Sequence, residues 1–206
     1  MEYAHDGLPK VGSSGKRWEG LGPNPRDLTN ATLDVNALAS RATHWSAVGI
    51  LPADALEELG AAGELTGPVQ AWVEARPIQR EGRVRVLVQG QCRGILRVAC
   101  VRCLNEFPLD IDAEIDALYA VGKDPAMKNK KWRFEEDLEF LPDGLLKIRH
   151  LVEEELLLAL PMHPVCVTGC AGLCVGCGAD LNRTQCQCRE NVSGGPFAVL
   201  QSLQSS

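Results

Sequence analysis

The stretch Phe107–Tyr119, FPLDIDAEIDALY, alternates apolar and acidic side chains along most of its length. Its apolar residues stand at every second position: Phe107, Leu109, Ile111, Ala113, Ile115, Ala117 and Tyr119. Because successive side chains of a strand point to opposite faces, this period of two predicts one long antiparallel strand. We expect the apolar side to face a core and the acidic side to face water or a basic partner.

Segments that precede this strand predict further strands of the same sheet. Val69–Ala75 is one of them. Arg83–Val88 predicts another, which we expect to turn at residues 89–91 and to return as a strand over Arg93–Cys103. Arginines in these segments are placed to pair across the sheet with the acidic side chains.

Two other segments predict helices. Residues 53–59 follow Pro52, which favours a helix start, and precede Gly60, which we expect to stop the helix. Leu145–Leu160 repeats apolar residues at helical spacing and is followed by Pro161, which ends a helix. The expected fold class is therefore α+β: an antiparallel β-sheet or partial barrel with one packed helix and a C-terminal zinc-binding cysteine cluster.

That cluster is the sequence CAGLCVGCGADLNRTQCQC, residues 170–188. A Cys-x2-Cys turn holds two sulfurs close together, and a second short pair after a loop completes a tetrahedral site. We expect structural zinc here, against the alternatives of a disulfide knot, free thiols or a mobile tail that binds metal opportunistically. Which four thiols bind is open, because the partners of Cys174 and Cys177 are drawn from three others. The candidate ligands are Cys170, Cys174, Cys177, Cys186 and Cys188.

A second Cys-x2-Cys pair, Cys100 and Cys103, lies between two predicted strands. The chain must turn there for the sulfurs to meet, since strand residues three apart face opposite ways. The pair is a redox dithiol, a source of ligands to a metal shared with the tail, or a turn with half-buried thiols. Cys92 and Cys166 are not part of a Cys-x2-Cys pair, so we expect them to be packing residues. His163 is a further candidate ligand, although we expect it on a surface loop.

Composition limits the classes of function. The 206 residues carry a formal net charge of −6, so the chain has no global attraction for nucleic acid and any RNA contact must be local. One basic segment beside Trp132 offers such a contact, although a solvated loop has the same composition. The candidate RNA contacts are Lys128, Lys130, Lys131 and Arg133.

Neither a secretion signal nor a membrane span is expected, because the first residues lack an apolar core and the longest uncharged stretch is broken by prolines and glycines. Nine cysteines then favour a reducing cytoplasm. The sequence contains no catalytic triad pattern, phosphate-binding loop or histidine cluster. We expect a protein that is not an enzyme, with no small-molecule substrate and no membrane partner.

Four segments in a fixed order resemble the bacterial YceD family of large ribosomal RNA subunit accumulation proteins. They are the Cys100–Leu104 turn with Phe107, EEELLLALPMHP (153–164), the CAGLCVGCGADLN and CQC motifs, and the terminal PFAVLQSL. The resemblance covers roughly residues 65–203. It implies a cytoplasmic, non-enzymatic protein needed for accumulation of 23S ribosomal RNA, with a ribosomal precursor, either rRNA or a ribosomal protein, as its partner.

On this basis we divide the chain into four parts. We expect a disordered extension over residues 1–30 and a YceD-like α+β domain over residues 31–164. We expect a cysteine-rich zinc-binding segment over residues 165–190 and a C-terminal apolar segment over residues 191–206. Two alternatives to the ribosomal role remain. One is a zinc-braced adaptor that binds protein without touching RNA, and the other is a thiol oxidoreductase that uses Cys100 and Cys103.

Overall fold

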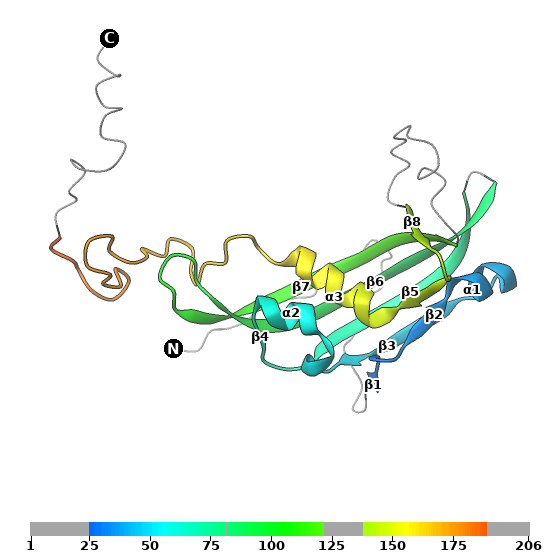
Figure 1. Ribbon diagram of the computed structural model, residues 1–206, viewed down its shortest axis with the longest axis horizontal. Coiled ribbons are helices and arrows are strands. Elements are labelled where there is room, and N and C mark those ends of the chain that lie inside the picture. Colours follow the sequence, from blue (N-terminus) through cyan, green and yellow to red (C-terminus); the bar gives the residue numbers. More distant parts are fainter. Residues whose placement is uncertain (1–24, 81, 122–137, 189–206) are drawn as a thin grey trace, which may run out of the picture. The chain divides into compact units, whose positions relative to one another are not determined.

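The structure is a computed structural model, and it describes residues 25–80, 82–121 and 138–188 (Figure 1). The chain divides into two compact units. Among the described residues, the first unit comprises those up to Val98 together with those from Pro108 to Met162, and the second comprises Ala99–Phe107 together with those from His163 onward. The second unit holds every cysteine except Cys92.

Seven of the described strands form one sheet. Its path runs through β1 (Arg26–Asp27), β3 (Trp45–Leu51), β5 (Val69–Arg80), β6 (Arg83–Ala99), β7 (Glu106–Val121) and β8 (Leu138–Leu141), and β4 (Glu64–Leu65) pairs with β6. A separate two-stranded sheet joins β2 (Thr32–Asp34) to β9 (Leu145–Lys147). The described part of the chain is thus mostly strand, a half-barrel sheet with few helices.

The sheet is mixed, so the expected antiparallel arrangement is confirmed for some of the strand pairs and not for others. The β3–β5, β4–β6 and β5–β6 pairs are antiparallel, whereas β1 pairs with β3 and β7 pairs with β8 in parallel. Parallel neighbours need a long connection between them. The chain between the end of β7 and the start of β8 is long enough for one, and nothing in the alternation of β7 itself reveals the direction of its neighbour.

The alternation of β7 is confirmed by burial. Ile111 and Ile115 are almost completely buried, whereas Asp110, Glu114 and Asp116 are exposed. The apolar face of the long strand therefore supplies the core, and its acidic face meets solvent, as the period of two predicts.

The predicted turn at residues 89–91 is wrong, because β6 runs without interruption through Gly90. Gly90 pairs with Val73 of β5, and a side chain on it would overlap the carbonyl oxygen of Trp72. The glycine thus permits close approach of two strands. The hairpin turn lies earlier, where Gly82 adopts φ 73°, a conformation that glycine adopts readily.

The described helices are α1 (Val35–Arg41), the 3-10 turn η1 (Ala53–Ala55), α2 (Glu57–Ala62) and α3 (Ile148–Ala159). The segment predicted as one helix over 53–59 is divided between η1 and α2, and α2 continues past Gly60. The predicted helix over Leu145–Leu160 loses its first three residues to β9, because they pair with β2. No described helix is long and apolar enough to cross a lipid bilayer.

Helix α3 covers the apolar face of the sheet (Figure 1). Leu151, Val152 and Leu156 on α3 are buried. The Sγ atom of Cys92 on β6 lies 3.8 Å from the carbonyl oxygen of Ala113 on β7 and 3.9 Å from that of Val152. These contacts place α3 over β6 and β7, where its apolar stripe closes the core of the first unit.

Candidate metal centres

The turn between β6 and β7 brings Cys100 and Cys103 to the same side of the chain. The backbone NH of Leu104 donates to the carbonyl of Cys100 at 2.9 Å, and the NH of Cys100 donates to the carbonyl of Asn105 at 2.9 Å. Leu104 adopts φ 60°, in the left-handed region, which closes the turn tightly. The turn that the Cys-x2-Cys spacing requires is therefore present.

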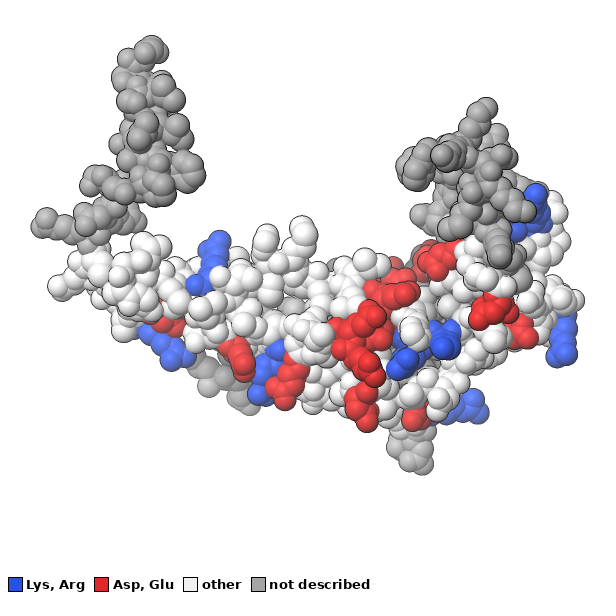
Figure 2. All heavy atoms as spheres, viewed as in Figure 1, with Lys and Arg blue, Asp and Glu red and all other residues white. Residues whose placement is uncertain are grey.

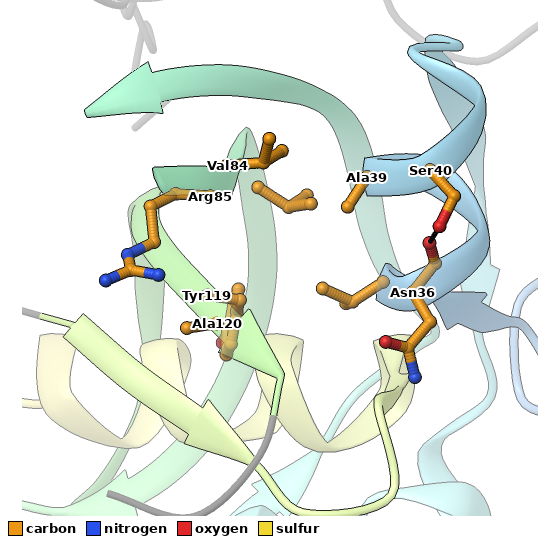
Figure 3. A pocket seen from close by; sticks show the side chains of 9 residues that line it. Asn36, Ala39, Ser40, Val84, Arg85, Tyr119 and Ala120 are labelled. Carbon is orange, nitrogen blue, oxygen red and sulfur yellow. Dashed lines mark hydrogen bonds between the residues drawn. The ribbon is translucent and has the colours of Figure 1, made fainter. Parts of the chain in front are cut away.

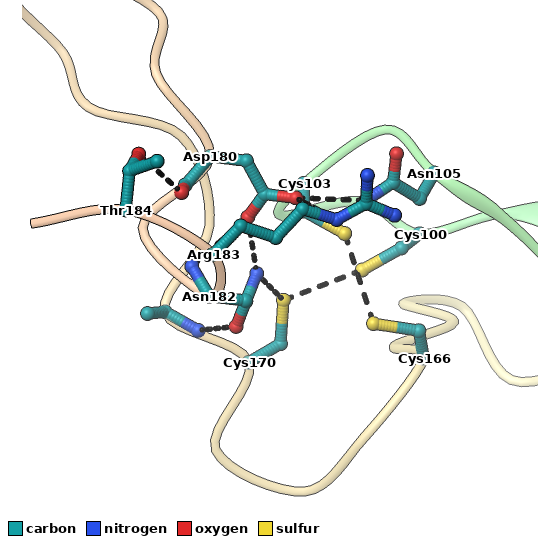
Figure 4. A network of polar contacts seen from close by, with 10 residues as sticks. Cys100, Cys103, Asn105, Cys166, Cys170, Asp180, Asn182, Arg183 and Thr184 are labelled. Atoms are coloured by element: carbon teal, nitrogen blue, oxygen red, sulfur yellow. Dashed lines mark hydrogen bonds and ion pairs between the residues drawn. The ribbon is translucent and has the colours of Figure 1, made fainter.

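Two further cysteines reach this turn from the loop that follows α3. The NH of Val101 donates to the carbonyl of Pro164 at 2.9 Å, which holds the loop against the turn. Figure 4 shows the sulfurs facing one another, with Sγ–Sγ distances of 3.8 Å between Cys100 and Cys170 and 3.7 Å between Cys103 and Cys166. All four sulfurs lie within 4.8 Å of one another. The Cys100 group consists of Cys100, Cys103, Cys166 and Cys170.

A second set of four thiols forms around the next turn. The NH of Gly178, at φ 72°, donates to the carbonyl of Cys174 at 2.8 Å, and the NH of Cys174 donates to the carbonyl of Ala179 at 2.8 Å. The Sγ atom of Cys186 lies 3.4 Å from the sulfurs of both Cys174 and Cys177. The Cys174 group consists of Cys174, Cys177, Cys186 and Cys188, again within 4.8 Å of one another.

These distances match a four-coordinate metal ion better than a disulfide. Four sulfurs at about 2.3 Å from one ion are about 3.8 Å apart along each edge of the tetrahedron. The shortest sulfur contacts in the two groups are 3.4–3.8 Å. A disulfide would require about 2.05 Å, and all nine cysteines are free thiols. Each group is thus positioned to hold one metal ion with four protein ligands.

Backbone NH groups also point at the sulfurs, as thiolate ligands require. The NH of Arg102 donates to the Sγ atom of Cys100 at 3.4 Å, and the NH of Gly176 donates to that of Cys174 at 3.4 Å. A third such bond, of 3.2 Å, runs from the NH of Cys188 to the Sγ atom of Cys186. These donors stabilise negative charge on sulfur in both groups.

Within each group, the pKa of one thiol is lowered and the pKa of another is raised. Burial raises the pKa of Cys100, but hydrogen bonds from backbone NH groups, that of Cys103 foremost, outweigh it and lower the pKa to about 6. The NH groups of Gly176 and Cys177 lower the pKa of Cys174 to about 6. The opposite shift occurs at another member of each group. Burial, followed by hydrogen bonding to neighbouring thiols, raises the pKa of Cys166 to about 12.

In the Cys174 group, hydrogen bonding to the other thiols, that of Cys186 first, raises the pKa of Cys188 to about 12. In each group, therefore, one thiol loses its proton readily, and the remaining thiols resist further deprotonation. A divalent cation removes that resistance, because its charge compensates the thiolates. The donor set of each group fits such an ion.

The two groups differ in exposure. Cys100 is fully buried and Cys103 and Cys170 nearly so, and Phe107 and Leu173 pack against them. In the Cys174 group, two members are half-buried and the other two, Cys177 and Cys188, are exposed. The Cys100 group is thus the core of the second unit, and the Cys174 group lies at its surface.

The structure separates the five candidate ligands of the tail. It brings Cys174, Cys177, Cys186 and Cys188 together and places Cys170 in the Cys100 group. Cys166, which the sequence suggested as a packing residue, joins Cys170 there. Two features of the sequence could have indicated this. Cys166 lies four residues before Cys170, and the Cys100 and Cys103 pair needs two more thiols to complete a set of four.

Other residues singled out in the sequence lie elsewhere. Cys92 is buried in the first unit, where desolvation raises the pKa of its thiol. His163 is exposed and belongs to neither group. The candidate RNA contacts Lys128, Lys130, Lys131 and Arg133 lie outside the described residues, as do residues 1–24 and the apolar segment 191–206.

A pocket of about 350 Å³ opens in the first unit between α1 and strands β6 and β7 (Figure 3). Its polar lining includes Asn36, Ser40 and Arg85, and the Ser40 hydroxyl donates to the carbonyl of Asn36 at 2.8 Å. Apolar side chains such as Val86 complete the wall. The pocket brings together no set of thiols or carboxylates, whereas both groups of four thiols lie in the second unit.

Acidic side chains form a band across the face shown in Figure 2. On α3, burial, followed by the charges of Glu139 and Glu154, raises the pKa of Glu155. With the exposed acidic face of β7, the first unit thus presents negative charge on more than one side.

The mixed sheet and the two groups of four thiols define a small β-rich protein with a cysteine-rich unit that is positioned to hold metal ions. The chain belongs to the YceD family, "Large ribosomal RNA subunit accumulation protein YceD", whose family model matches residues 88–204. That range contains all nine cysteines.

Two curated relatives are similar to the chain. One is the Arabidopsis thaliana protein "Large ribosomal RNA subunit accumulation protein YCED homolog 1, chloroplastic", 24% identical over 66% of this chain and 49% of the relative. The other is an uncharacterized protein of Mycobacterium leprae (strain TN), 28% identical over 47% of this chain and 43% of that protein. The chain therefore spans just under half the length of these relatives. No solved structure matches it.

Proposed function

We propose that this chain is a non-enzymatic factor for the accumulation of large-subunit (23S) ribosomal RNA, and that zinc occupies both thiol groups as a structural ion. The observation that supports the proposal most strongly is the family match over residues 88–204, which includes both groups. The same name is carried by the Arabidopsis relative. We place its action in the cytoplasm, where reducing conditions keep thiols free.

Zinc is the ion that best suits these ligands. Sets of four cysteine thiolates with tetrahedral spacing are typical of structural zinc, which adds folding stability where a small unit has little core of its own. In the Cys100 group, Cys100 and Cys103 would hold the hairpin turn, and Cys166 and Cys170 would hold the loop after α3. In the Cys174 group the ligands would close a single loop. Each group already provides four ligands, so neither is arranged like a catalytic site with an open position.

The role in rRNA accumulation is tested by removing the gene from its own organism and measuring the ratio of 23S to 16S rRNA. We expect the ratio to fall and a plasmid copy of the wild-type chain to restore it. Co-sedimentation of the chain with large-subunit precursors, followed by crosslink mapping, identifies the partner. An unchanged ratio together with absence from every ribosomal fraction would refute the role.

A protein-binding adaptor without RNA contact is the second candidate. It is favoured by the exposed acidic residues Asp110, Glu114 and Asp116 on β7 and by the net charge of −6, which suit a basic ribosomal protein better than a phosphate backbone. Binding to purified rRNA separates the two candidates. Direct contact weakens steeply with salt and with Lys130→Glu or Lys131→Glu, whereas an adaptor binds naked rRNA weakly and regardless of these changes.

A thiol oxidoreductase that uses Cys100 and Cys103 is less well supported. The sulfurs of Cys100 and Cys103 face those of Cys170 and Cys166 in one group of four thiols, so the two do not stand as an isolated dithiol. A metal ion held by all four thiols would block their redox chemistry. Turnover of a disulfide substrate by the zinc-loaded protein, abolished by Cys100→Ser, would restore this candidate.

A further inference from the structure

The side chain of Asn182 connects the two thiol groups. Asn182 lies in the loop between Cys177 and Cys186, both members of the Cys174 group, yet its Nδ2 atom donates to the Sγ atom of Cys170 at 3.4 Å. Its Oδ1 atom accepts a hydrogen bond from the NH of Ala171, next to Cys170, at 2.8 Å. The amide thus holds both the sulfur and the following backbone of a ligand that belongs to the Cys100 group (Figure 4).

Asp180 holds Asn182 in this orientation. Its Oδ1 atom accepts from the backbone NH of Asn182 at 2.9 Å and from the side-chain Nδ2 at 2.7 Å. Its Oδ2 atom accepts from the side chain of Asn105 at 3.0 Å, in the turn that carries Cys103. Hydrogen bonds from Asn182, first from its backbone, lower the pKa of Asp180 and keep it ionised. One carboxylate therefore links the loop of the Cys174 group to the turn of the Cys100 group.

Backbone bonds reinforce the link. The NH of Leu173 donates to the carbonyl of Arg102 at 3.1 Å, and the NH of Leu181 donates to the carbonyl of Gly172 at 2.9 Å. Leu173 and Asp180 form an isolated antiparallel bridge. The short segment between Cys170 and Cys174 is consequently fastened on one side to the Cys100 turn and on the other to the loop that carries Asn182.

We propose that Asn182, positioned by Asp180, couples the two metal centres, so that a metal ion in the Cys174 group raises the affinity of the Cys100 group for its own ion. The proposal rests on the metal-binding part of the proposed function. An ion in the Cys174 group closes the loop and fixes Asn182 where its amide donor meets Cys170. That donor offsets part of the negative charge of four thiolates, the role that outer-shell partners have around metal sites. Coupling of this kind is reciprocal.

The test is a cycle of variants of the full chain, kept reduced and titrated with zinc against a chromophoric chelator. Cys186→Ser disables the Cys174 group. The wild type, Cys186→Ser, Asn182→Ala and the double variant are the four proteins in which the affinity of the Cys100 group is measured. Cobalt substitution reports thiolate ligation in both groups through thiolate-to-metal absorption, which depends on the number of sulfur ligands.

We expect Cys186→Ser and Asn182→Ala each to weaken zinc binding at the Cys100 group about 10-fold or more, the usual effect of losing an outer-shell partner. Together they should weaken it scarcely more than either alone, because both remove the same link. Additive effects of the two substitutions would overturn the coupling. So would a zinc affinity of the Cys100 group that is unchanged by Cys186→Ser.

Two further variants keep the test decisive if Asn182→Ala folds poorly. Asn182→Asp preserves the size of the side chain and its acceptor but places an anion against the Cys170 sulfur, so it should weaken the Cys100 group at least as much as alanine does. Near-normal affinity of this variant for zinc would overturn the coupling. Thr184→Ala, in the same loop, removes a hydroxyl that donates to the carbonyl of Asp180 and should leave the affinity within about 2-fold.

The outcomes also separate this inference from the proposed function. Two tightly bound zinc ions with independent affinities would overturn the coupling alone. Failure of the wild-type chain to bind any metal would overturn both the coupling and the zinc part of the proposed function. The role in rRNA accumulation is measured separately and is unaffected by either result.

Discussion

The side-chain Oε1 atom of Glu153 accepts a hydrogen bond from the backbone NH of Glu58 at 2.8 Å, and it also accepts one from the NH of Leu59 at 3.1 Å. These NH groups belong to the first turn of α2, where the residue before the helix, Leu56, offers no side-chain cap. Glu153 lies on α3 and is only 6% exposed. A carboxylate from another helix therefore performs the capping role that α2 cannot supply itself.

Removal of this cap should destabilise the first unit. We expect Glu153→Ala to lower the free energy of unfolding by about 1–3 kcal/mol, because two NH groups of α2 lose a charged acceptor in a buried place. Urea unfolding followed by circular dichroism measures the change. The neighbouring, exposed Glu154→Ala is the matched control and should stay within about 0.5 kcal/mol. Equal effects of the two variants would argue against the capping role.

Two leucines of α3 test how its apolar stripe packs. Leu156 is fully buried, whereas Leu158 is 81% exposed on the same helix. Leu156→Ala should lower the free energy of unfolding by about 2–5 kcal/mol because it leaves a cavity in the core. Leu158→Ala should change it by less than about 0.5 kcal/mol. A thermal melt that shifts equally for both variants would contradict the orientation of α3 described above.

Substitution of two glycines by alanine tests two different effects, close packing of strands and helix propensity. Gly90→Ala should destabilise the first unit by about 1–3 kcal/mol, because the added methyl group would overlap the carbonyl oxygen of Trp72. Gly60→Ala adds a methyl group to α2 where no atom lies within 4 Å, so it should raise stability by about 0.5–1 kcal/mol. Opposite signs in chemical denaturation are the expected result. A stabilising Gly90→Ala would contradict the close approach of β5 and β6 at this position.

Metal content should equal two zinc ions per chain, one for each group. Native mass spectrometry of Cys103→Ser and of Cys177→Ser should each show at most one, because each variant breaks a different set of four thiols. Cys92→Ala is the control, since Cys92 is buried in the first unit and belongs to neither group, and it should keep two ions. Two ions retained in both serine variants would exclude the ligand sets assigned above.

Chelation should loosen the second unit without unfolding the first. After zinc removal, the backbone NH groups of Cys174 and Gly178, which donate to carbonyls within the same turn, should exchange with deuterium faster by about 10-fold or more. Amides of α3 in the core of the first unit are the internal reference and should keep their protection. The prediction fails if the turn stays protected while every thiol of the chelated protein reacts with an alkylating reagent.

Much of the first unit could be predicted from local patterns, because periodicity reflects which side of an element is buried. The alternation over Phe107–Tyr119 predicted β7, and the apolar stripe that ends before Pro161 predicted α3. Gly90 was misread because a glycine that permits close strand approach and a glycine that makes a turn look the same in one sequence. The parallel neighbours of β3 and β7 could not be predicted, since strand order depends on long-range pairing.

The sequence by itself determined that thiols near residues 170–188 gather closely enough to hold a metal ion, because short cysteine spacings restrict how far apart the sulfurs can lie. Only the tertiary structure decided which thiols belong to the Cys100 group and which belong to the Cys174 group. Cys100 meets Cys170 and Cys103 meets Cys166 across separations of 70 and 63 residues. Such contacts depend on how β6, β7 and the loop after α3 are arranged in space, and no local spacing encodes that arrangement.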